Sequence, residues 1–215
     1  MESIAILRHS VRIFEVIAFV VGLFYFKRTN TSYWKCFPFY IGLVAFIELM
    51  GWYFSAHKMY DENVKLYRFV GFPVQFIFLF WLYKMILELK DKIFVFCTII
   101  YILSWVLEYN FLPKQEFSMM SVSFTVGNLI LLILVFLYFY QLINSDKIIT
   151  FSKQRAFWVS LGVLVYYLGC FPFYGLFNTL LKNFDLYLIY LNIVLVLGSL
   201  MYILFIASFI WGKEN

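Results

Sequence analysis

Charged residues are scarce in this chain of 215 residues, where Asp, Glu, Lys and Arg together make up 13%. Soluble domains carry roughly 25% charged and 45–50% apolar residues. Here 64% of the residues are hydrophobic and 24% are aromatic. A chain with so little charge exposes most of its surface to lipid, so the composition predicts an integral membrane protein. No polar stretch is long enough for a second fold, so we expect one membrane domain over residues 1–215.

Cysteines and the usual catalytic motifs are also rare or absent. The three cysteines, Cys36, Cys97 and Cys170, are far apart, which excludes a disulfide framework and a CxxC metal or redox site. There is no Gly-rich phosphate loop, no Ser/His/Asp set and no zinc-protease motif. His57 and Asp61 have a spacing that a metal could use, but a solvated loop is the simpler interpretation. We therefore assign no catalytic residue, cofactor or metal.

Seven apolar segments approach the length of about 20 residues that a spanning helix needs. Short linkers join them, so sequence neighbours are expected to be antiparallel. The sequence predicts an all-α polytopic membrane protein with seven transmembrane helices in an up-down bundle. The predicted spans are 10–26, 37–55, 66–86, 93–109, 118–142, 157–180 and 186–211.

The net charge of +5 comes from basic residues between the apolar runs, a pattern that sets membrane orientation and does not indicate nucleic-acid binding. The more basic side is expected to face the cytoplasm, which puts the N-terminus outside and the C-terminus in the cytoplasm. The cytoplasmic group is Lys27, Arg28, Lys35, Lys84, Lys90, Lys92, Lys147, Lys153, Arg155 and Lys213. The outer group is Arg8, Arg12, Lys58, Lys65, Arg68, Lys114 and Lys182.

A shift of the chain by 120 positions superimposes the first three spans on the last three. This arrangement indicates a 3+1+3 parallel pseudo-repeat, as in some transporter folds. Two similar membrane hairpins could also match by composition alone. The matching pairs include Lys27 with Lys147, Gly42 with Gly162, Asn63 with Asn183 and Tyr67 with Tyr187.

Polar residues interrupt five of the spans at a similar depth, roughly 9–15 Å below the outer surface at about 1.5 Å per residue. A carboxylate at such depth costs about 2.5–3.5 kcal/mol on insertion scales, so it needs a partner or a function. The five residues are Glu15, Glu48, Gln75, Asn128 and Asn192.

We hypothesise that these five residues, with Tyr166 and Tyr167, line a small polar ligand-binding cavity in the outer half of the bundle. Two carboxylates in a dry site do not both ionise cheaply, so the pair could carry a proton or hold a cation. The alternative is a set of interhelical hydrogen bonds worth about 0.6 kcal/mol each, with Glu15 paired to Arg12. Pro73 and Pro172 are expected to kink their helices near the same depth, because proline removes a backbone donor.

The last third of the chain carries a resemblance. Residues 156–162 (AFWVSLG) run into residues 166–172 (YYLGCFP), after a span that ends in YFYQL at residues 138–142. This pattern resembles a group of uncharacterised small seven-helix membrane proteins of Bacteroidetes-type bacteria. The resemblance implies a bacterial cytoplasmic (inner) membrane and brings no activity with it.

Three function classes remain open. The first is a binding or sensing module for a small molecule, a lipid or a membrane-protein partner, with a pocket closed on the cytoplasmic side. The second is a small secondary transporter of the 3+1+3 type, which needs a path to both faces. The third is an intramembrane lipid-modifying enzyme with Glu15 and Glu48 as acid and base. We favour the binding module, because few polar residues continue into the inner half.

Overall fold

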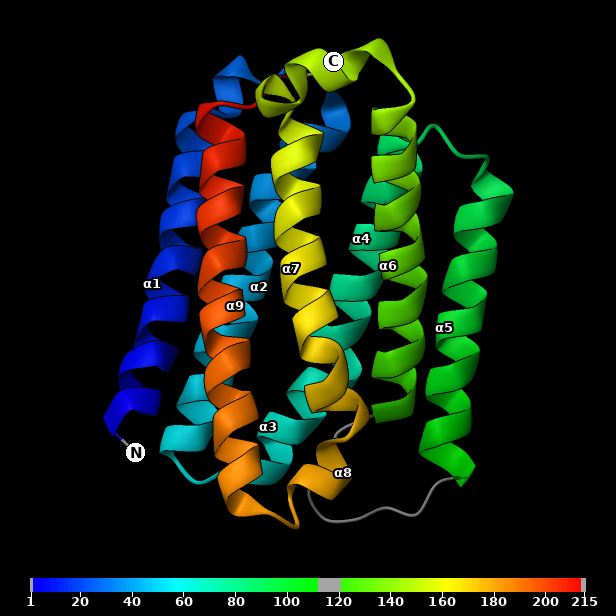
Figure 1. The fold of residues 1–215 in the computed structure, drawn as a ribbon. Helices are drawn as coiled ribbons and strands as arrows, with labels where there is room; N and C mark the ends of the chain where they lie inside the picture. Colours follow the sequence, from blue (N-terminus) through cyan, green and yellow to red (C-terminus); the bar gives the residue numbers. More distant parts are fainter. Residues whose placement is uncertain (1, 112–120, 214–215) are drawn as a thin grey trace.

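The computed structural model describes residues 2–111 and 121–213, and it is almost entirely helical. The long helices run alternately up and down the bundle (Figure 1). They are α1 (Glu2–Phe24), α2 (Ser32–Ala56), α4 (Phe72–Ile86), α5 (Asp91–Phe111), α6 (Ser121–Ile143), α7 (Arg155–Gly175) and α9 (Phe184–Ile210). The short elements are the 3-10 turns η1 (Phe26–Arg28) and η3 (Asp146–Lys153), helices α3 (Tyr60–Leu66) and α8 (Phe177–Leu180), and a π-helical turn, η2 (Tyr67–Gly71).

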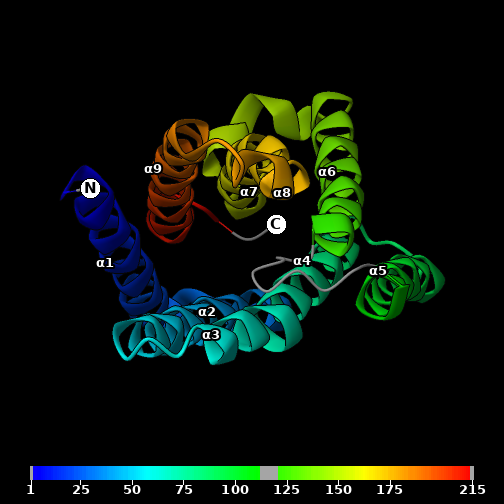
Figure 2. The ribbon, with the colours of Figure 1, turned by 90° about the horizontal axis from the view of Figure 1, so that it is seen from below.

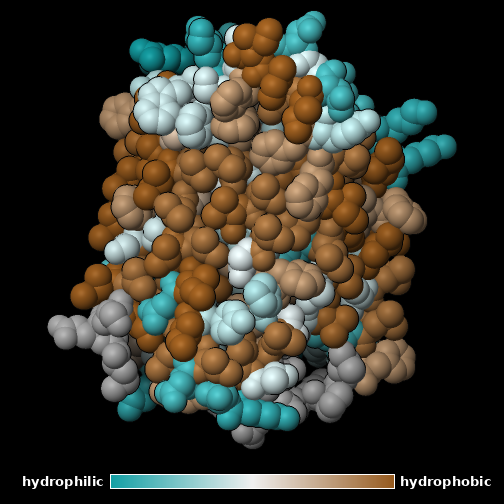
Figure 3. Space-filling model, in the orientation of Figure 1, coloured by the Kyte–Doolittle hydropathy of each residue, from teal (hydrophilic) through white to brown (hydrophobic). Residues whose placement is uncertain are grey.

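The helices are those of a multi-pass membrane protein. Within the described residues, six helical runs are long and apolar enough to cross a bilayer, and α3, η2 and α4 count as one run over Tyr60–Ile86. Hydrophobic side chains cover the side of the bundle in Figure 3, while hydrophilic ones gather at its two ends. The prediction of an all-helical polytopic protein is confirmed. The first helix, α1, runs beside the six but interrupts its apolar face with Arg8, Arg12 and Glu15.

Six of the long helices form a ring, and one lies outside it. Seen from below in Figure 2, α1, α2, α4, α6, α7 and α9 follow one another around the bundle, and α1 packs against α9 to close the circle. Helix α5 lies outside the ring and packs against α4 and α6, and its Trp105 and Tyr109 also contact Phe69 of η2. We call the end where α1 begins the N-terminal end, and the end where α9 finishes the C-terminal end.

Several predicted boundaries are wrong, for local reasons. Helix α1 begins near Glu2 rather than at residue 10. The predicted linker between the second and third spans, residues 56–65, contains most of α3, whose first turn holds two acidic residues that favour a helix N-terminus. The sixth span ends at Gly175 rather than at residue 180, three residues after Pro172. Lys114 and the start of the fifth predicted span, residues 118–120, lie outside the described residues.

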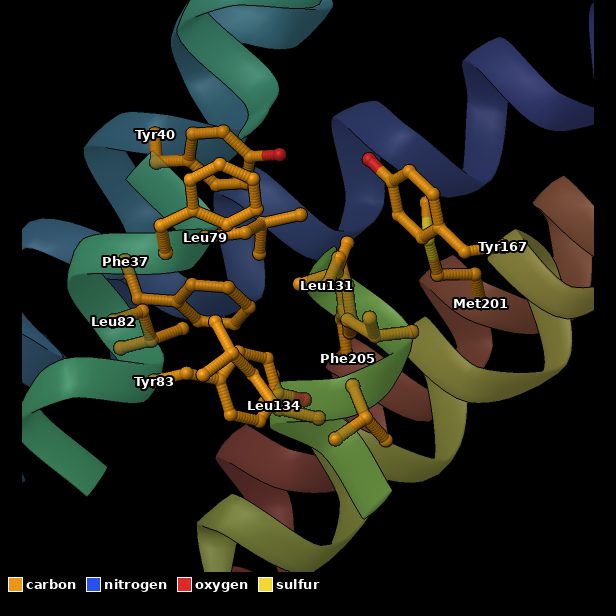
Figure 4. Packing of buried hydrophobic residues seen from close by; sticks show 14 of the residues in the cluster. Phe37, Tyr40, Leu79, Leu82, Tyr83, Leu131, Leu134, Tyr167, Met201 and Phe205 are labelled. Atoms are coloured by element: carbon orange, nitrogen blue, oxygen red, sulfur yellow. The ribbon is translucent and has the colours of Figure 1, made fainter. Parts of the chain in front are cut away.

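The C-terminal half of the bundle is filled by a buried core. Figure 4 shows aromatic and aliphatic side chains from facing helices meeting there without a charged partner among those drawn. Phe37 lies at the centre, with ring centroids 5.1 Å from Phe205 and 5.7 Å from Phe209. Trp34 packs on the other edge of Phe37 at 5.8 Å. We call Trp34, Phe37, Phe205 and Phe209 the aromatic plug.

Arg155 is the main departure from the predicted charge pattern. It was expected in a cytoplasmic loop, but it begins α7 and is only 3% exposed. Its guanidinium donates to the Thr29 hydroxyl at 3.1 Å and lies over the rings of Trp34 and Phe209. Because burial of a charge needs such compensation, Arg155 is a structural part of the plug as well as a basic residue of that end.

Candidate functional site

A cavity of about 360 Å³ occupies the N-terminal half of the bundle, inside the ring. Its lining reaches exposed side chains, including Arg8 and Ser55, at the N-terminal end. Aromatic side chains dominate its walls. Seven of them are tyrosines: Tyr40, Tyr67, Tyr166, Tyr167, Tyr174, Tyr187 and Tyr202. Such a cavity, apolar in its walls with a few polar groups, has the usual make-up of a small-molecule site.

Glu48 lines this cavity and has a defined partner. The Tyr67 hydroxyl donates to the Glu48 carboxylate at 2.8 Å. The tyrosine can approach because α2 carries Gly51 there: a Cβ on that residue would lie 2.6 Å from the Tyr67 hydroxyl oxygen. Tyr67 itself begins the π-helical turn, a feature found frequently at functional sites. Local backbone features of two helices therefore support one partly buried hydrogen bond.

The π-helical turn also explains what Pro73 does. Within the turn, the Phe72 amide bonds to the Tyr67 carbonyl, five residues back. The next bond of that pattern would join residue 73 to the Arg68 carbonyl, but proline has no N–H. The Trp105 indole donates to the Arg68 carbonyl instead, at 3.1 Å. Pro73 thus leaves the Arg68 carbonyl available to Trp105, and the resulting hydrogen bond links α5 to the rest of the bundle.

Pro172 lies inside α7, near its end. The helix stops three residues later, at Gly175, and the Leu176 amide then bonds to the Pro172 carbonyl at 3.1 Å. The chain turns there into α8, whose Phe177 lines the cavity. The proline therefore stands where the cavity wall passes from α7 to α8, at the depth that the sequence predicts.

Glu15 lies behind the cavity wall. It is 1% exposed and is not among the lining residues, because Tyr202 stands between it and the cavity. The Tyr202 hydroxyl donates to the Glu15 carboxylate at 2.5 Å. Arg12, the partner considered for Glu15 from the sequence, lies over the ring of Trp52 instead, 5.7 Å from its centroid. Each of the two carboxylates is thus held by a tyrosine from another helix.

The other predicted site residues divide into three groups. Gln75, Tyr166 and Tyr167 line the cavity with Glu48, and the Tyr167 hydroxyl donates to the Gln75 side chain at 3.4 Å. Asn128 is fully buried behind Tyr167 and donates to its backbone carbonyl at 2.8 Å. Asn192 donates to the Leu188 carbonyl of its own helix and is not part of the lining. Of the predicted site residues, Glu48, Gln75, Tyr166 and Tyr167 therefore line the cavity, whereas Glu15, Asn128 and Asn192 do not.

Sequence reasoning missed most of the lining. Arg8 was interpreted only as a topology charge, Arg12 as a topology charge or a partner of Glu15, and five of the seven lining tyrosines were not considered as cavity residues. The sequence did contain a pattern that marks these residues. Lining residues of α2 recur at helical spacing, at positions 40, 44, 48, 51, 52 and 55, and those of α9 at 187, 191, 194, 195, 198, 201, 202 and 205. This periodicity marks one face of each helix.

The cavity ends at the aromatic plug. Its deepest lining residues on α2 and α9 are Tyr40 and Phe205, and Phe37 and Phe209 follow, both almost fully buried. In Figure 4 the hydroxyls of Tyr40 and Tyr167 point toward one another from opposite sides of the bundle, beside Leu131 and Phe205. The structure therefore has a cavity that reaches one end of the bundle and is blocked toward the other.

Neither a family model, nor a curated protein, nor a solved structure matches this chain. The resemblance drawn from the C-terminal third stays a prediction. Within the described residues, no group of three or more His, Cys, Asp and Glu side chains is close enough to hold a metal ion. The chemistry of the cavity rests on carboxylate, guanidinium, amide and phenol groups.

Proposed function

We propose that this protein is a membrane-embedded ligand-binding module, and that the N-terminal cavity binds a small molecule. The observation that carries the proposal is the Glu48–Tyr67 hydrogen bond on the wall of the aromatic cavity. A carboxylate inside a membrane bundle is costly, and such residues mark functional sites by default. Here the π-helical turn and Gly51 allow Tyr67 to reach Glu48. Because two backbone features support this hydrogen bond, it favours a binding site over a chance contact.

The proposal includes α1 as a seventh membrane span. Its charged residues face the interior: Arg8 and Arg12 line the cavity, and Glu15 bonds to Tyr202. Its opposite face exposes Ile13, Val16, Ile17, Val20, Leu23 and Phe24. Charged residues in spans face the bundle or a cavity in this way. A helix that is polar inward and apolar outward is compatible with lipid on its outer side.

We further propose that the cavity faces the outside of a bacterial cytoplasmic membrane, with the C-terminus in the cytoplasm. The distribution of Lys and Arg supports this orientation. The position of α5 outside the ring supports the 3+1+3 arrangement, in which the fourth span is a linker between two sets of three. The closed C-terminal half favours binding over transport, because a transporter needs a path through the aromatic plug.

Native mass spectrometry of the protein in mild detergent tests the function. We expect a bound mass on the wild type that disappears in Glu48→Gln, because the amide lacks the charge that Tyr67 holds in place. Glu62→Gln is the matched control, since Glu62 is an exposed acidic residue of α3 at the same end. A bound mass that persists in Glu48→Gln, or an empty cavity in all three proteins, would contradict the proposal.

A further inference from the structure

The cavity carries charges of both signs close together. Arg12 lies over the Trp52 ring, and Trp52 follows Glu48 by one turn of α2. Residues four apart on a helix have Cβ atoms about 5–6 Å apart. Arg8, one turn before Arg12 on α1, adds a second guanidinium to the same lining. Two positive groups and a negative group therefore line the same cavity.

These charges are held by neighbours other than each other. Glu48 accepts from the Tyr67 hydroxyl, and Arg12 is held against the face of Trp52. A purely anionic ligand would be attracted by the arginines and repelled by Glu48, and a purely cationic ligand would meet the reverse. A ligand with both charges side by side would form charge-assisted hydrogen bonds at both positions. The arginines and Glu48 together therefore favour a zwitterionic ligand.

The rest of the cavity is apolar and aromatic. Beyond Glu48 the walls include Val44, Tyr40, Met201 and Phe205, and the aromatic plug closes the end. Pockets for small ligands have volumes of roughly 300–1,000 Å³, so about 360 Å³ suits a compact molecule. A ligand with its charges near the arginines would direct an apolar group inward, among rings that stack on aromatic side chains.

We propose that the cavity binds an α-amino acid with an apolar or aromatic side chain. The carboxylate meets Arg8 and Arg12, the ammonium group meets Glu48, and the side chain lies among the tyrosine and phenylalanine rings. In this class of compound the two charges share one carbon, which suits arginine and glutamate side chains that line the same cavity. The inference rests on the proposed binding function and names its ligand class.

Calorimetric titration of the detergent-purified protein with matched probes tests the inference. The probes are L-phenylalanine, 2-phenylethylamine, which lacks the carboxylate, and 3-phenylpropionate, which lacks the ammonium group. We expect phenylalanine to bind at least about tenfold more tightly than either analogue, because each loses one charge-assisted contact. L-Leucine and L-tryptophan extend the test to other apolar side chains.

Two variants assign the charges to residues. Arg12→Gln should reduce the preference for phenylalanine over 2-phenylethylamine, because only Arg8 then remains for the ligand carboxylate, and Glu48→Gln should make phenylalanine and 3-phenylpropionate bind alike. Lys58→Gln, which removes an exposed charge at the same end, should leave all ratios unchanged. Thermal unfolding without ligand shows whether each variant is folded. If Arg12→Gln is unfolded, Arg8→Gln tests the contact between the arginines and the ligand carboxylate instead.

The outcomes separate this inference from the proposed function. A bound mass in native spectra that depends on Glu48 but is a lipid without an ammonium group would retain the binding function and overturn the amino-acid class. Equal binding of the three phenyl probes, or no binding of phenylalanine, leucine or tryptophan at millimolar concentration, would also overturn it. An empty cavity together with no probe binding would refute both.

Discussion

The two halves of the bundle bury polar groups in different ways. In the C-terminal half, Tyr83 and Arg155 find partners within the core: the Tyr83 hydroxyl donates to Ser160 at 3.0 Å, and Arg155 is enclosed by Thr29, Trp34 and Phe209. In the N-terminal half, tyrosines, Gln75 and Glu48 face a cavity. The same residue type, tyrosine, is thus a core residue at one end and a cavity wall at the other.

This difference separates the parts that hold the fold from the parts that we propose bind a ligand. Substitutions in the C-terminal half should lower stability without changing ligand preference, since they leave the cavity lining intact. Substitutions of the lining should change binding with smaller losses of stability, because those side chains already lack close packing on one side.

Arg155→Ala should have the largest effect on stability. It leaves a void at the end of the aromatic plug and removes the bond to Thr29 and both cation–π contacts. We expect a loss of about 2–4 kcal/mol in the free energy of unfolding. Equilibrium unfolding in mixed micelles measures it. Lys153→Ala, an exposed neighbour, should change stability by less than about 0.5 kcal/mol, and equal losses in both variants would contradict the structural role of Arg155.

Gly51→Ala should weaken binding strongly while Gly198→Ala does not. Both glycines line the cavity, but a Cβ on Gly51 would lie 2.6 Å from the Tyr67 hydroxyl oxygen, whereas one on Gly198 would have its nearest contact at 3.5 Å. Displacing Tyr67 releases Glu48, so the affinity for L-phenylalanine should fall about tenfold, or roughly 1.4 kcal/mol. Calorimetry of both variants measures the difference, and similar affinities would show that the Tyr67–Glu48 bond is not needed.

Tyr83→Phe should lower stability and leave binding unchanged. The hydroxyl and its Ser160 partner are buried, so removing one leaves the other without its bond, at a cost of about 1 kcal/mol. Tyr140→Phe is the control, since Tyr140 is 68% exposed. Unfolding and phenylalanine titration on the same samples provide the comparison. A tenfold change in affinity for Tyr83→Phe would mean that the two halves are coupled.

Much of the bundle could be predicted from the sequence, because spans and their alternation depend on local hydrophobicity. The apolar runs mark every long helix, and short linkers fix the antiparallel order. The end of α7 near Pro172 and the helical start of α3 were not predicted, since they depend on caps and turns that hydropathy does not report. The burial of Arg155 depends on contacts with Thr29 and Trp34, more than 120 positions away in the chain, and no local pattern contains them.

The sequence indicated how far along their helices the polar residues lie, but not which way their side chains face. Distance along a helix placed Glu48 and Gln75 correctly relative to each other, because the rise per residue is constant. Rotation about the helix axis decides which side chains face inward, and the Asn192 side chain donates to the Leu188 carbonyl of its own helix and is not part of the lining. The π-helical turn at Tyr67–Gly71 changes this rotation within one helix, so no regular helical pattern would have brought Tyr67 to Glu48.

Glu108→Gln should produce the smallest effect and confine it to the peripheral helix. The Glu108 carboxylate on α5 accepts bonds from the Val122 and Ser123 amides at 2.9 and 2.7 Å, which caps the start of α6. Loss of its charge at a helix N-terminus should cost about 0.5–1 kcal/mol. Hydrogen exchange should accelerate at those two amides and remain unchanged in α9, with Glu62→Gln as the silent control. Faster exchange along α7 or α9 would show that α5 also stabilises the ring. The peripheral helix would then contribute to the fold together with the C-terminal half.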